Sequence, residues 1–285
     1  MERKATYETN DREGVGNMTK LLLGLFAVGV LQACQAVPAA AQVARFRYDP
    51  DRVDAGTLLL YEKSNVDGTH AGKIALYIAA EDRLEAFKWH EGGNSATLVI
   101  AEMNWDAFSV RRFESWRLHA DGTRQLQGTL EQIDGEPKVV IAFGPDNQQT
   151  VELHHWPWHS YDFDLASLSA SMRHLIDPEA TFQVGIADLA MVADTLRFVE
   201  KGTVTIEYLG REDRNGIASR KYAIDGEGLA HRGGYLWMDA ERGYIVDYEI
   251  DLPDEPGFES GKLRLLARRS LDQTGWEHFM QERLD

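Results

Sequence analysis

The sequence predicts a mainly β protein: a highly curved antiparallel sheet, half-barrel-like, with one central helix and a short C-terminal helix. Three observations support this prediction. From Arg45 onward, apolar and polar residues alternate in runs of strand length. Turn-forming pairs, above all Asp121-Gly122 and Asn215-Gly216, lie between such runs and favour hairpins because both residues tolerate positive φ. A single stretch, 165–175, instead repeats apolar residues at helical spacing.

The first half of the chain contains strand patterns only. Turn clusters such as 65–68 and 92–93 separate them, and the Asp121-Gly122 pair joins two of them as a hairpin. The strands expected in this half cover residues 56–63, 73–78, 82–89, 96–103, 114–119, 124–133, 138–143 and 150–155.

The middle of the chain changes to a helical pattern. Leu165, Leu168, Met172 and Leu175 form one apolar stripe, and we expect this face to lie on the concave or open side of the sheet. Asp162 or Asp164 is the expected N-cap, and Asp177-Pro178 ends the segment. Capping also explains the Asp162-Phe163-Asp164 sequence better than a phosphatase nucleophile pair does, since that pair needs a parallel sheet.

Strand patterns then resume and continue almost to the C-terminus. A short helix, 276–284, is expected to follow them, capped near Thr274. No Pro-rich, Ser-rich or charged linker divides the chain, so 45–285 is expected to form a single curved-sheet domain. The strands expected in this half cover residues 203–209, 219–224, 234–238, 244–250 and 262–267.

Charge excludes one class of partner. The formal net charge is -16, and residues 1–42 contribute nothing to it because their four acidic and four basic residues cancel. The acidic body is a poor electrostatic match for nucleic acid, and no basic stripe compensates for it. We therefore expect no nucleic-acid binding.

The N-terminal region indicates export. Lys20 precedes an apolar run from Leu21 to Leu31, which as a helix would rise only about 16 Å, roughly half of a bilayer core. Such a run followed by small residues is typical of a secretory signal, here 18–41. The polar residues 1–17 are atypical of a signal, so we expect them to be untranslated, with the start at Met18, or disordered.

The single cysteine indicates a lipid anchor. Cys34 follows the apolar run in the sequence Leu-Gln-Ala-Cys, which resembles a bacterial lipobox. A lone cysteine at this one place favours lipidation, and Gln35 after it suggests, by resemblance to sorted lipoproteins, the outer membrane. The alternative is cleavage after 39–41 with loss of Cys34. In both cases the expected location is the periplasm, and we expect no disulfide in the mature fold.

A resemblance to a known family rests on residues 160–251. The matching pattern is the Tyr-Asp…Ser-Leu helix, the strand 208–212, the Asn215-Gly216 hairpin and the strand 236–239, which is followed by the strand 244–250. It resembles bacterial periplasmic proteins of unknown function related to the LolA/LolB half-barrel. Because LolA/LolB proteins bind acyl chains, the resemblance implies a lipid or another apolar molecule as the ligand.

The residues point to binding rather than catalysis. The sequence contains no Gly-x-Ser-x-Gly elbow, phosphate-cradling glycine loop or Cys/His pair. We therefore expect a non-enzymatic cell-envelope lipoprotein that binds an apolar ligand without a cofactor. The expected ligand-binding residues are the four of the helix stripe together with Trp156 and Trp158.

Two alternatives remain open at the level of sequence. His154, His155 and His159 lie close together in the chain and are suitable zinc ligands, so the first alternative is a metal-dependent hydrolase centred on them. Their spacing matches no known zinc motif. The second alternative is an interaction scaffold with a filled core, whose partner is another envelope protein.

Overall fold

The computed structural model describes residues 39–284 except 145, 194 and 254–256. The segment 1–17 and the lipidation candidate Cys34 lie outside the described residues, as does the expected signal segment 18–41 apart from its last three residues. None of the helices in the described ranges combines the length and the apolar composition needed to cross a membrane.

Strands make up most of the described chain. They are β1 (Thr57–Ser64), β2 (Gly72–Ile78), β3 (Arg83–Trp89), β4 (Ser95–Asn104), β5 (Ser109–His119), β6 (Arg124–Gln132), β7 (Lys138–Ala142), β8 (Gln148–Glu152), β9 (Trp158–His159), β10 (Phe182–Val192), β11 (Thr195–Arg214), β12 (Ile217–Asp225), β13 (Gly234–Asp239), β14 (Ile245–Ile250) and β15 (Gly261–Ser270).

The helices are few and short. They are α1 (Ala39–Val43), α2 (Ala166–Met172) and α3 (Gln273–Gln281), with two 3₁₀ turns, η1 (Pro50–Arg52) and η2 (Glu227–Leu229).

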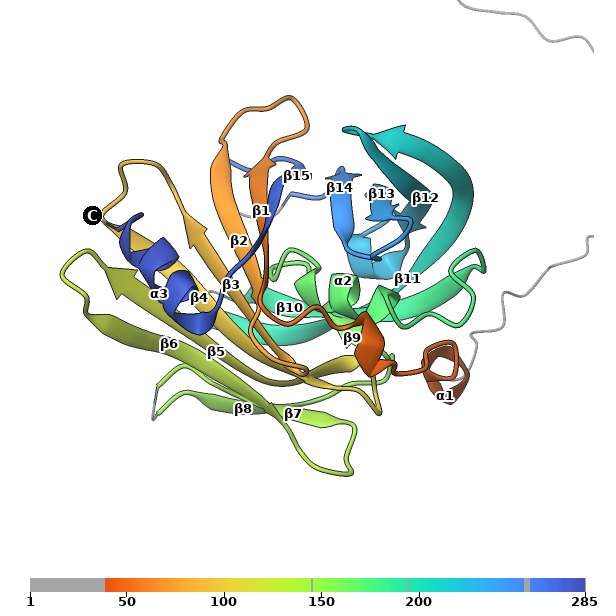
Figure 1. Ribbon diagram of the computed structural model, residues 1–285. Coiled ribbons are helices and arrows are strands. Elements are labelled where there is room, and N and C mark those ends of the chain that lie inside the picture. The colour runs from red at the N-terminus through yellow and green to blue at the C-terminus, as the bar shows by residue number, and fades with distance from the viewer. Residues whose placement is uncertain (1–38, 145, 194, 254–256, 285) are drawn as a thin grey trace, which may run out of the picture. The chain divides into compact units, whose positions relative to one another are not determined.

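All strands of the described residues belong to one open, highly curved sheet of fifteen strands (Figure 1). Its order is β8-β7-β6-β5-β4-β3-β2-β1-β15-β14-β13-β12-β11-β10-β9. Neighbours are antiparallel except β9, which pairs parallel to β10. The predicted curved antiparallel sheet with a central and a C-terminal helix is therefore confirmed.

The two halves of the chain are joined by its first and last strands. β1 pairs with β2 on one side and with β15 on the other, where Leu58 lies opposite Arg269. Apart from β9, which pairs parallel to β10, each half is a succession of hairpins between strands adjacent in sequence. This arrangement follows from the turn chemistry, since short connections between alternating runs produce antiparallel neighbours.

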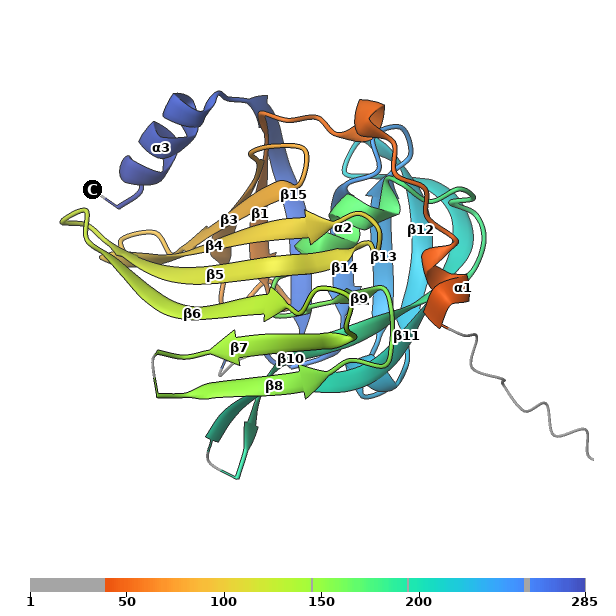
Figure 2. The ribbon, with the colours of Figure 1, turned by 90° about the horizontal axis from the view of Figure 1, so that it is seen from below.

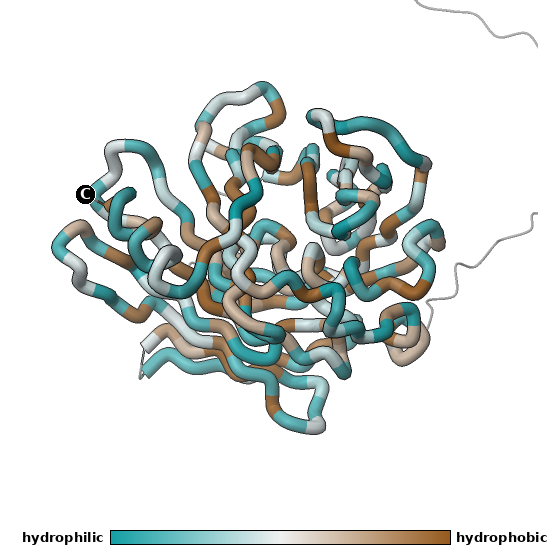
Figure 3. Tube along the Cα trace, viewed as in Figure 1, coloured by the Kyte–Doolittle hydropathy of each residue, from teal (hydrophilic) through white to brown (hydrophobic). Residues whose placement is uncertain are grey.

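The alternation of side chains covers both faces of the sheet. On β4, Val99 packs in the large core cluster with α2 on the concave face, whereas Leu98 packs in the cluster with α3. Figures 1 and 2 show α3 against the outside of the sheet, away from α2, and Figure 3 shows hydrophobic and hydrophilic residues interchanging along the strands. The central helix α2 thus lies on the concave side of the sheet, as the sequence predicts.

Helix α3 packs on the sheet through Trp276, Phe279 and Met280, and Trp276 is fully buried. Trp276 stacks on Tyr77 with ring centroids 5.0 Å apart, and its Nε1 donates to Oε2 of the buried Glu85 at 2.7 Å. Asp272 caps the helix by accepting from the Gly275 amide at 2.8 Å. The expected cap near Thr274 is therefore wrong by two residues: α3 begins at Gln273, because Asp272 caps it through the third amide of its first turn.

Strand β10 has no counterpart among the expected strands. It contains Gly185, where a Cβ atom would lie 2.3 Å from the carbonyl oxygen of His155. The Gly185 amide donates to the Pro157 carbonyl at 2.7 Å. The glycine thus permits the segment before β9 to lie directly on β10, and this contact places β9 beside the interior of the sheet.

Candidate functional site

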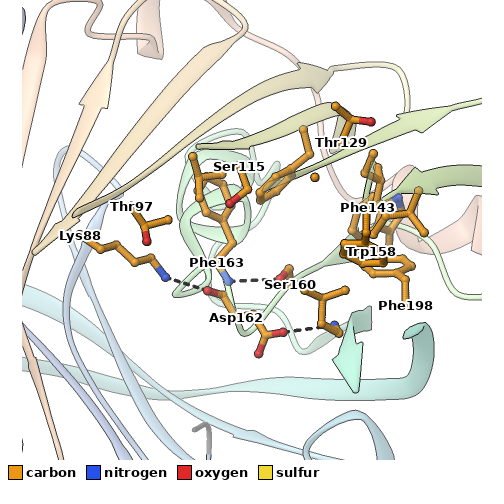
Figure 4. A pocket seen from close by; sticks show the side chains of 16 residues that line it. Lys88, Thr97, Ser115, Thr129, Phe143, Trp158, Ser160, Asp162, Phe163 and Phe198 are labelled. Atoms are coloured by element: carbon orange, nitrogen blue, oxygen red, sulfur yellow. Dashed lines mark hydrogen bonds between the residues drawn. The ribbon is translucent and has the colours of Figure 1, made fainter. Parts of the chain in front are cut away.

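A cavity of about 220 Å³ lies on the concave face, between β3–β7 and the segment around β9 (Figure 4). We call it the chamber. One wall comes from strands of the first half and includes Val99, Leu130 and Ile141; the opposite wall includes Trp158 of β9 and Phe198 of β11. Nearly all of these side chains are buried members of the main core cluster. The chamber is therefore an apolar space within the core.

Aromatic contacts hold the second wall in place. Phe163 meets Phe113 of β5 edge-on at 4.7 Å between centroids, and Trp158 meets Phe198 in the same way at 5.8 Å. The Trp158 amide donates to the Ser109 hydroxyl at 2.8 Å. The Trp158 side chain is 1% exposed, and its Nε1 has no hydrogen-bond partner among the described residues.

A second, wider cavity of about 750 Å³ adjoins the chamber, and we call it the vestibule. Lys88, Thr97, Asp162 and Leu189 line both spaces, so the chamber opens into the vestibule at these residues. Arg117 adds a further cation to the vestibule wall. The apolar chamber thus meets water through a charged opening.

Apolar side chains of the β10–β11 hairpin border the vestibule. Met191 is 66% exposed and Leu196 is 40% exposed, and both line this cavity. Large apolar side chains exposed beside a cavity are a common feature of binding sites for apolar molecules.

A buried ion-pair cluster lies under the opening. Asp164 is nearly inaccessible, and its carboxylate is 2.8 Å from Lys63 Nζ and also pairs with Lys88. Lys88 Nζ donates in addition to the Asp162 carbonyl at 2.8 Å. Burial alone raises the pKa of Asp164, but the two ammonium groups outweigh it and hold the pKa below its ordinary value.

This cluster corrects the expected N-cap of the central helix. Asp164 and Leu165 have φ of 52° and 54°, and Leu165 is the N-cap residue, without a side-chain capping bond. Asp162 instead accepts from the Leu189 amide at 3.1 Å. Both carboxylates are therefore used in tertiary contacts, which here replace local capping.

A second buried acid lies next to the first cluster. Asp188 is 1% exposed; it accepts from the Asp162 amide at 3.3 Å and lies 3.4 Å from Lys201 Nζ. Burial raises the pKa of Asp188 above its ordinary value despite the opposing effect of Lys201. These charges fix the 160–164 segment that forms one side of the opening.

The structure places only part of the expected ligand-binding set at the chamber. Trp158 lines it, whereas Trp156 is half-buried and lines a separate space of about 30 Å³. The helix-stripe residues are all buried in the main core cluster, and none of them lines the chamber: Leu165, Leu168, Met172 and Leu175. Met172 and Leu175 border another, polar cavity instead.

The three histidines have different hydrogen-bond partners: His154 and His155 contact Glu200, whereas His159 contacts Ser167. The amides of His154 and His155 both donate to Glu200, and each Nδ1 lies 3.0 Å from that carboxylate. His159 is fully buried with Nδ1 3.0 Å from the Ser167 hydroxyl, and burial lowers its pKa to about 3. In the described part of the chain, no three His, Cys, Asp or Glu side chains are placed to hold a metal ion.

The residues that sequence reasoning missed come mainly from strands. Phe113, Leu130 and Phe198 line the chamber, yet each is one apolar residue in an alternating pattern. The one local signal was the Asp162–Asp164 sequence, since both acids lie at or beneath the opening.

Comparisons with known proteins give structural likenesses only. No protein-family model matches the chain, and no curated protein matches it significantly. A crystal structure of a β-barrel-like protein of the domain of unknown function DUF1849 from Brucella abortus shares 12% identity at a TM-score of 0.41, covering 76% of this chain and 98% of that one.

Two further crystal structures are similar at lower TM-scores. A DUF1089 family protein from Pseudomonas aeruginosa has 15% identity and a TM-score of 0.37, over 61% of this chain and 87% of that one. A putative outer membrane lipoprotein-sorting protein domain from Vibrio parahaemolyticus has 11% identity and a TM-score of 0.30, over 82% of this chain and 94% of that one.

Proposed function

We propose that this protein is a non-enzymatic binding protein of the cell envelope that holds the apolar part of a lipid or similar molecule in the chamber. The observation that carries the proposal is the chamber itself, an apolar space in the core that opens at Lys88 and Asp162. Trp158, expected from sequence as a ligand contact, forms part of its wall.

The free-energy cost of an empty apolar cavity supports an apolar ligand. A residual apolar cavity of about 220 Å³ costs at most on the order of 5 kcal/mol, a figure that open access to water reduces. Each methylene moved from water into such a space contributes about 0.8 kcal/mol. A short stretch of acyl chain therefore recovers much of this cost.

The opening supports a ligand with one polar end. Lys88 is one-quarter exposed and lines both cavities, so a polar group held there keeps contact with water and with a cation. The chamber alone is smaller than the roughly 300–1,000 Å³ of typical small-molecule sites, but together with the vestibule it falls within that range. The chamber also favours binding over the alternative of a scaffold with a filled core.

The envelope location belongs to the same proposal. A signal at 18–41 exports the chain to the periplasm, and an acyl group on Cys34 anchors it, in our proposal to the outer membrane. A tethered carrier meets its ligand at the membrane surface, where apolar molecules are concentrated.

A cavity-filling variant tests the proposal. Ser115 lines the chamber (Figure 4), and Ser115→Trp fills part of it. If the added indole displaces only two methylenes of the ligand, at about 0.8 kcal/mol each, binding weakens about ten-fold. Glu131→Trp is the matched control, because Glu131 is exposed on β6 beside the chamber residue Leu130 and points to the opposite face.

The readouts are native mass spectrometry of the purified protein and titration with a fluorescent fatty acid. The unmodified protein and Glu131→Trp should carry an apolar molecule and bind the probe, whereas Ser115→Trp should lose both while its melting temperature is kept. Equal probe binding by both variants, or no probe binding by the unmodified protein, would contradict the proposal.

A further inference from the structure

A separate cavity of about 380 Å³ lies where α2 ends, and four arginines line it. We call it the arginine cavity. Arg52 comes from η1, Arg173 follows α2, Arg220 belongs to β12, and Arg242 lies in the turn between β13 and β14. Its lining has no residue in common with the chamber or the vestibule. Four cations from four elements therefore surround one space in a protein whose net charge is -16.

Arg173 is a buried cation that lines the cavity. Its side chain is 7% exposed, and within the described residues its guanidinium forms no ion pair and its buried Nε has no hydrogen-bond partner. Burial lowers its pKa. Proteins rarely bury a charge unless it is paired, because desolvation is expensive. Asp54, which lines the same cavity, is a nearby negative charge but forms no ion pair with Arg173 among the described residues, so the guanidinium is left without an anion in direct contact.

The neighbouring turn is built to pack on this arginine. Gly243 has a φ of 72°, and a Cβ atom there would lie 3.1 Å from Arg173 Cγ. The left-handed conformation favours glycine, and the missing side chain lets the turn lie against the Arg173 stem. In addition, the Arg173 carbonyl accepts from Arg52 Nη1 at 2.6 Å. These contacts hold the side chain in place beside the cavity.

Arg220 is the second uncompensated cation of the cavity. It is half-buried, and in the described structure its Nε is buried without a partner and its guanidinium forms no ion pair. The other two arginines differ, because Arg52 lies 3.2 Å from Asp49 and Arg242 lies 3.4 Å from Asp54. Two of the four guanidinium groups thus form no ion pair within the part of the chain that the structure describes.

We propose that the arginine cavity binds a phosphomonoester, whose phosphate is held by Arg173 and Arg220. A phosphomonoester carries about −1.5 to −2 charges at neutral pH, which matches the two unpaired cations. Guanidinium groups also fit phosphate oxygens through paired hydrogen bonds. A carboxylate would neutralise only one of the two.

The size and the rim of the cavity define the ligand further. A space of about 380 Å³ falls in the range of about 300–1,000 Å³ that small molecules occupy, so the phosphate is expected to carry an organic group. Three carboxylates also line the cavity: Asp51 and Glu241 are exposed and solvated by water, whereas Asp54 is half-buried and pairs with Arg242 and Arg268. They disfavour ligands with further negative charge.

The first test uses inorganic phosphate and glycerol 3-phosphate, titrated onto the purified full-length protein while its melting temperature is followed. Both should raise the melting temperature of the unmodified protein and of Arg47→Met. Arg47→Met is the control because it removes an exposed arginine that does not line the cavity. Arg173→Met and Arg220→Met should each weaken binding about ten-fold or more, since each loses charged hydrogen bonds.

The unliganded variants separate binding from a structural role. Replacing an unpaired buried charge by an apolar side chain of similar length is neutral or stabilising, so Arg173→Met should melt no lower than the unmodified protein when phosphate is absent. If Arg173→Met does not fold, Arg220→Met and Arg173→Lys carry the test. Glu241→Gln should strengthen binding by removing a repulsive charge, and lowering the pH to 5.5 should weaken it because the phosphate gains a proton.

Two results would overturn the proposal: no response of the unmodified protein to either phosphate, or equal responses in Arg47→Met and Arg220→Met. Vesicles containing phosphatidic acid, compared with glycerol 3-phosphate, distinguish a lipid headgroup from a soluble ester as the source. The chamber variant Ser115→Trp should respond to phosphate normally, so failure of this proposal is distinguishable from failure of the apolar-ligand proposal.

Discussion

Asp164 links two strands of the sheet near the opening of the chamber. Its carboxylate joins Lys63 of β1 to Lys88 of β3 beneath the start of α2. Removing one partner of a buried ion pair leaves the opposite charge uncompensated, which typically costs about 3–5 kcal/mol. Asp164→Asn should therefore lower the free energy of unfolding by about 3 kcal/mol, the lower end because Lys88 is partly exposed. Asp106→Asn, an exposed acid, is the control in urea unfolding.

The same residue predicts a pH dependence. Because its pKa is below the ordinary value of 3.8 in the folded protein, Asp164 contributes stability above about pH 4 that is lost as the pH falls towards the folded-state pKa. The difference in unfolding free energy between the unmodified protein and Asp164→Asn should thus shrink between pH 5 and pH 3. A difference that stays constant over this range would show that the ion pairs are not its source.

At the residue scale, the sequence identifies Asp162 and Asp164 as polar residues before a helix but does not predict their tertiary partners. The Asp162–Asp164 sequence precedes a helical stripe, and capping is the usual reason for such residues. The lysines that use Asp164 lie 76 and 101 positions earlier in the chain, so no local pattern connects them. Trp158 was expected at the ligand site and lines the chamber, whereas the helix-stripe residues fill the core beside it.

Among the elements, α3 combines aromatic packing on the sheet with a buried side-chain hydrogen bond. Trp276 Nε1 donates to Glu85 at 2.7 Å, and Arg83 lies 2.8 Å from the same carboxylate. Trp276→Phe keeps an aromatic ring but leaves Glu85 Oε2 without its indole donor, which should cost about 1–3 kcal/mol. Glu85→Leu should cost a similar amount because it leaves the indole N–H unpaired.

A double-mutant cycle measures this interaction directly. When both polar partners are removed, neither is left unsatisfied. The loss of unfolding free energy in Trp276→Phe/Glu85→Leu should therefore be smaller than the sum of the losses in the two single variants, by about 1 kcal/mol or more. Urea unfolding of the four proteins gives the coupling. Strictly additive costs would mean that the hydrogen bond does not hold α3.

Elements were predicted best where their signal is local. Hairpins with Asp-Gly and Asn-Gly turns fall where expected, because the turn geometry needs little beyond those two residues. Strand β10 was missed, although its Gly185 is explained at once by the His155 carbonyl that lies against it. That requirement arises from a contact between distant segments, and a sequence pattern does not contain it.

For the whole molecule, β15 is the strand that connects the two halves of the sheet. A chain ending at residue 260 lacks β15 and leaves both β1 and β14 unpaired along one edge, so it should show no cooperative thermal transition. A chain ending at 271 keeps β15 and loses only α3; it should unfold cooperatively at a lower temperature. Calorimetry distinguishes the two, and a cooperative transition in the shorter chain would show that each half folds alone.

The overall architecture could be predicted because alternation and turns repeat along most of the chain, and one curved sheet is the simplest way to bury such strands. The chamber could not be predicted in the same way. Its two walls come from β3–β7 and from β9–β11, and whether facing side chains meet or leave a gap depends on volumes across the sheet. Neither wall contains a pattern that differs from an ordinary core strand.

The pairing of β1 with β15 also has a consequence for biosynthesis. About 200 residues separate the two partners, so at roughly 5–20 residues per second the ribosome needs ~10–40 s to deliver the second after the first. During this interval the edge of β1 lacks its partner and can recruit strands of other nascent chains. The sheet thus remains incomplete until β15, its last strand, has emerged.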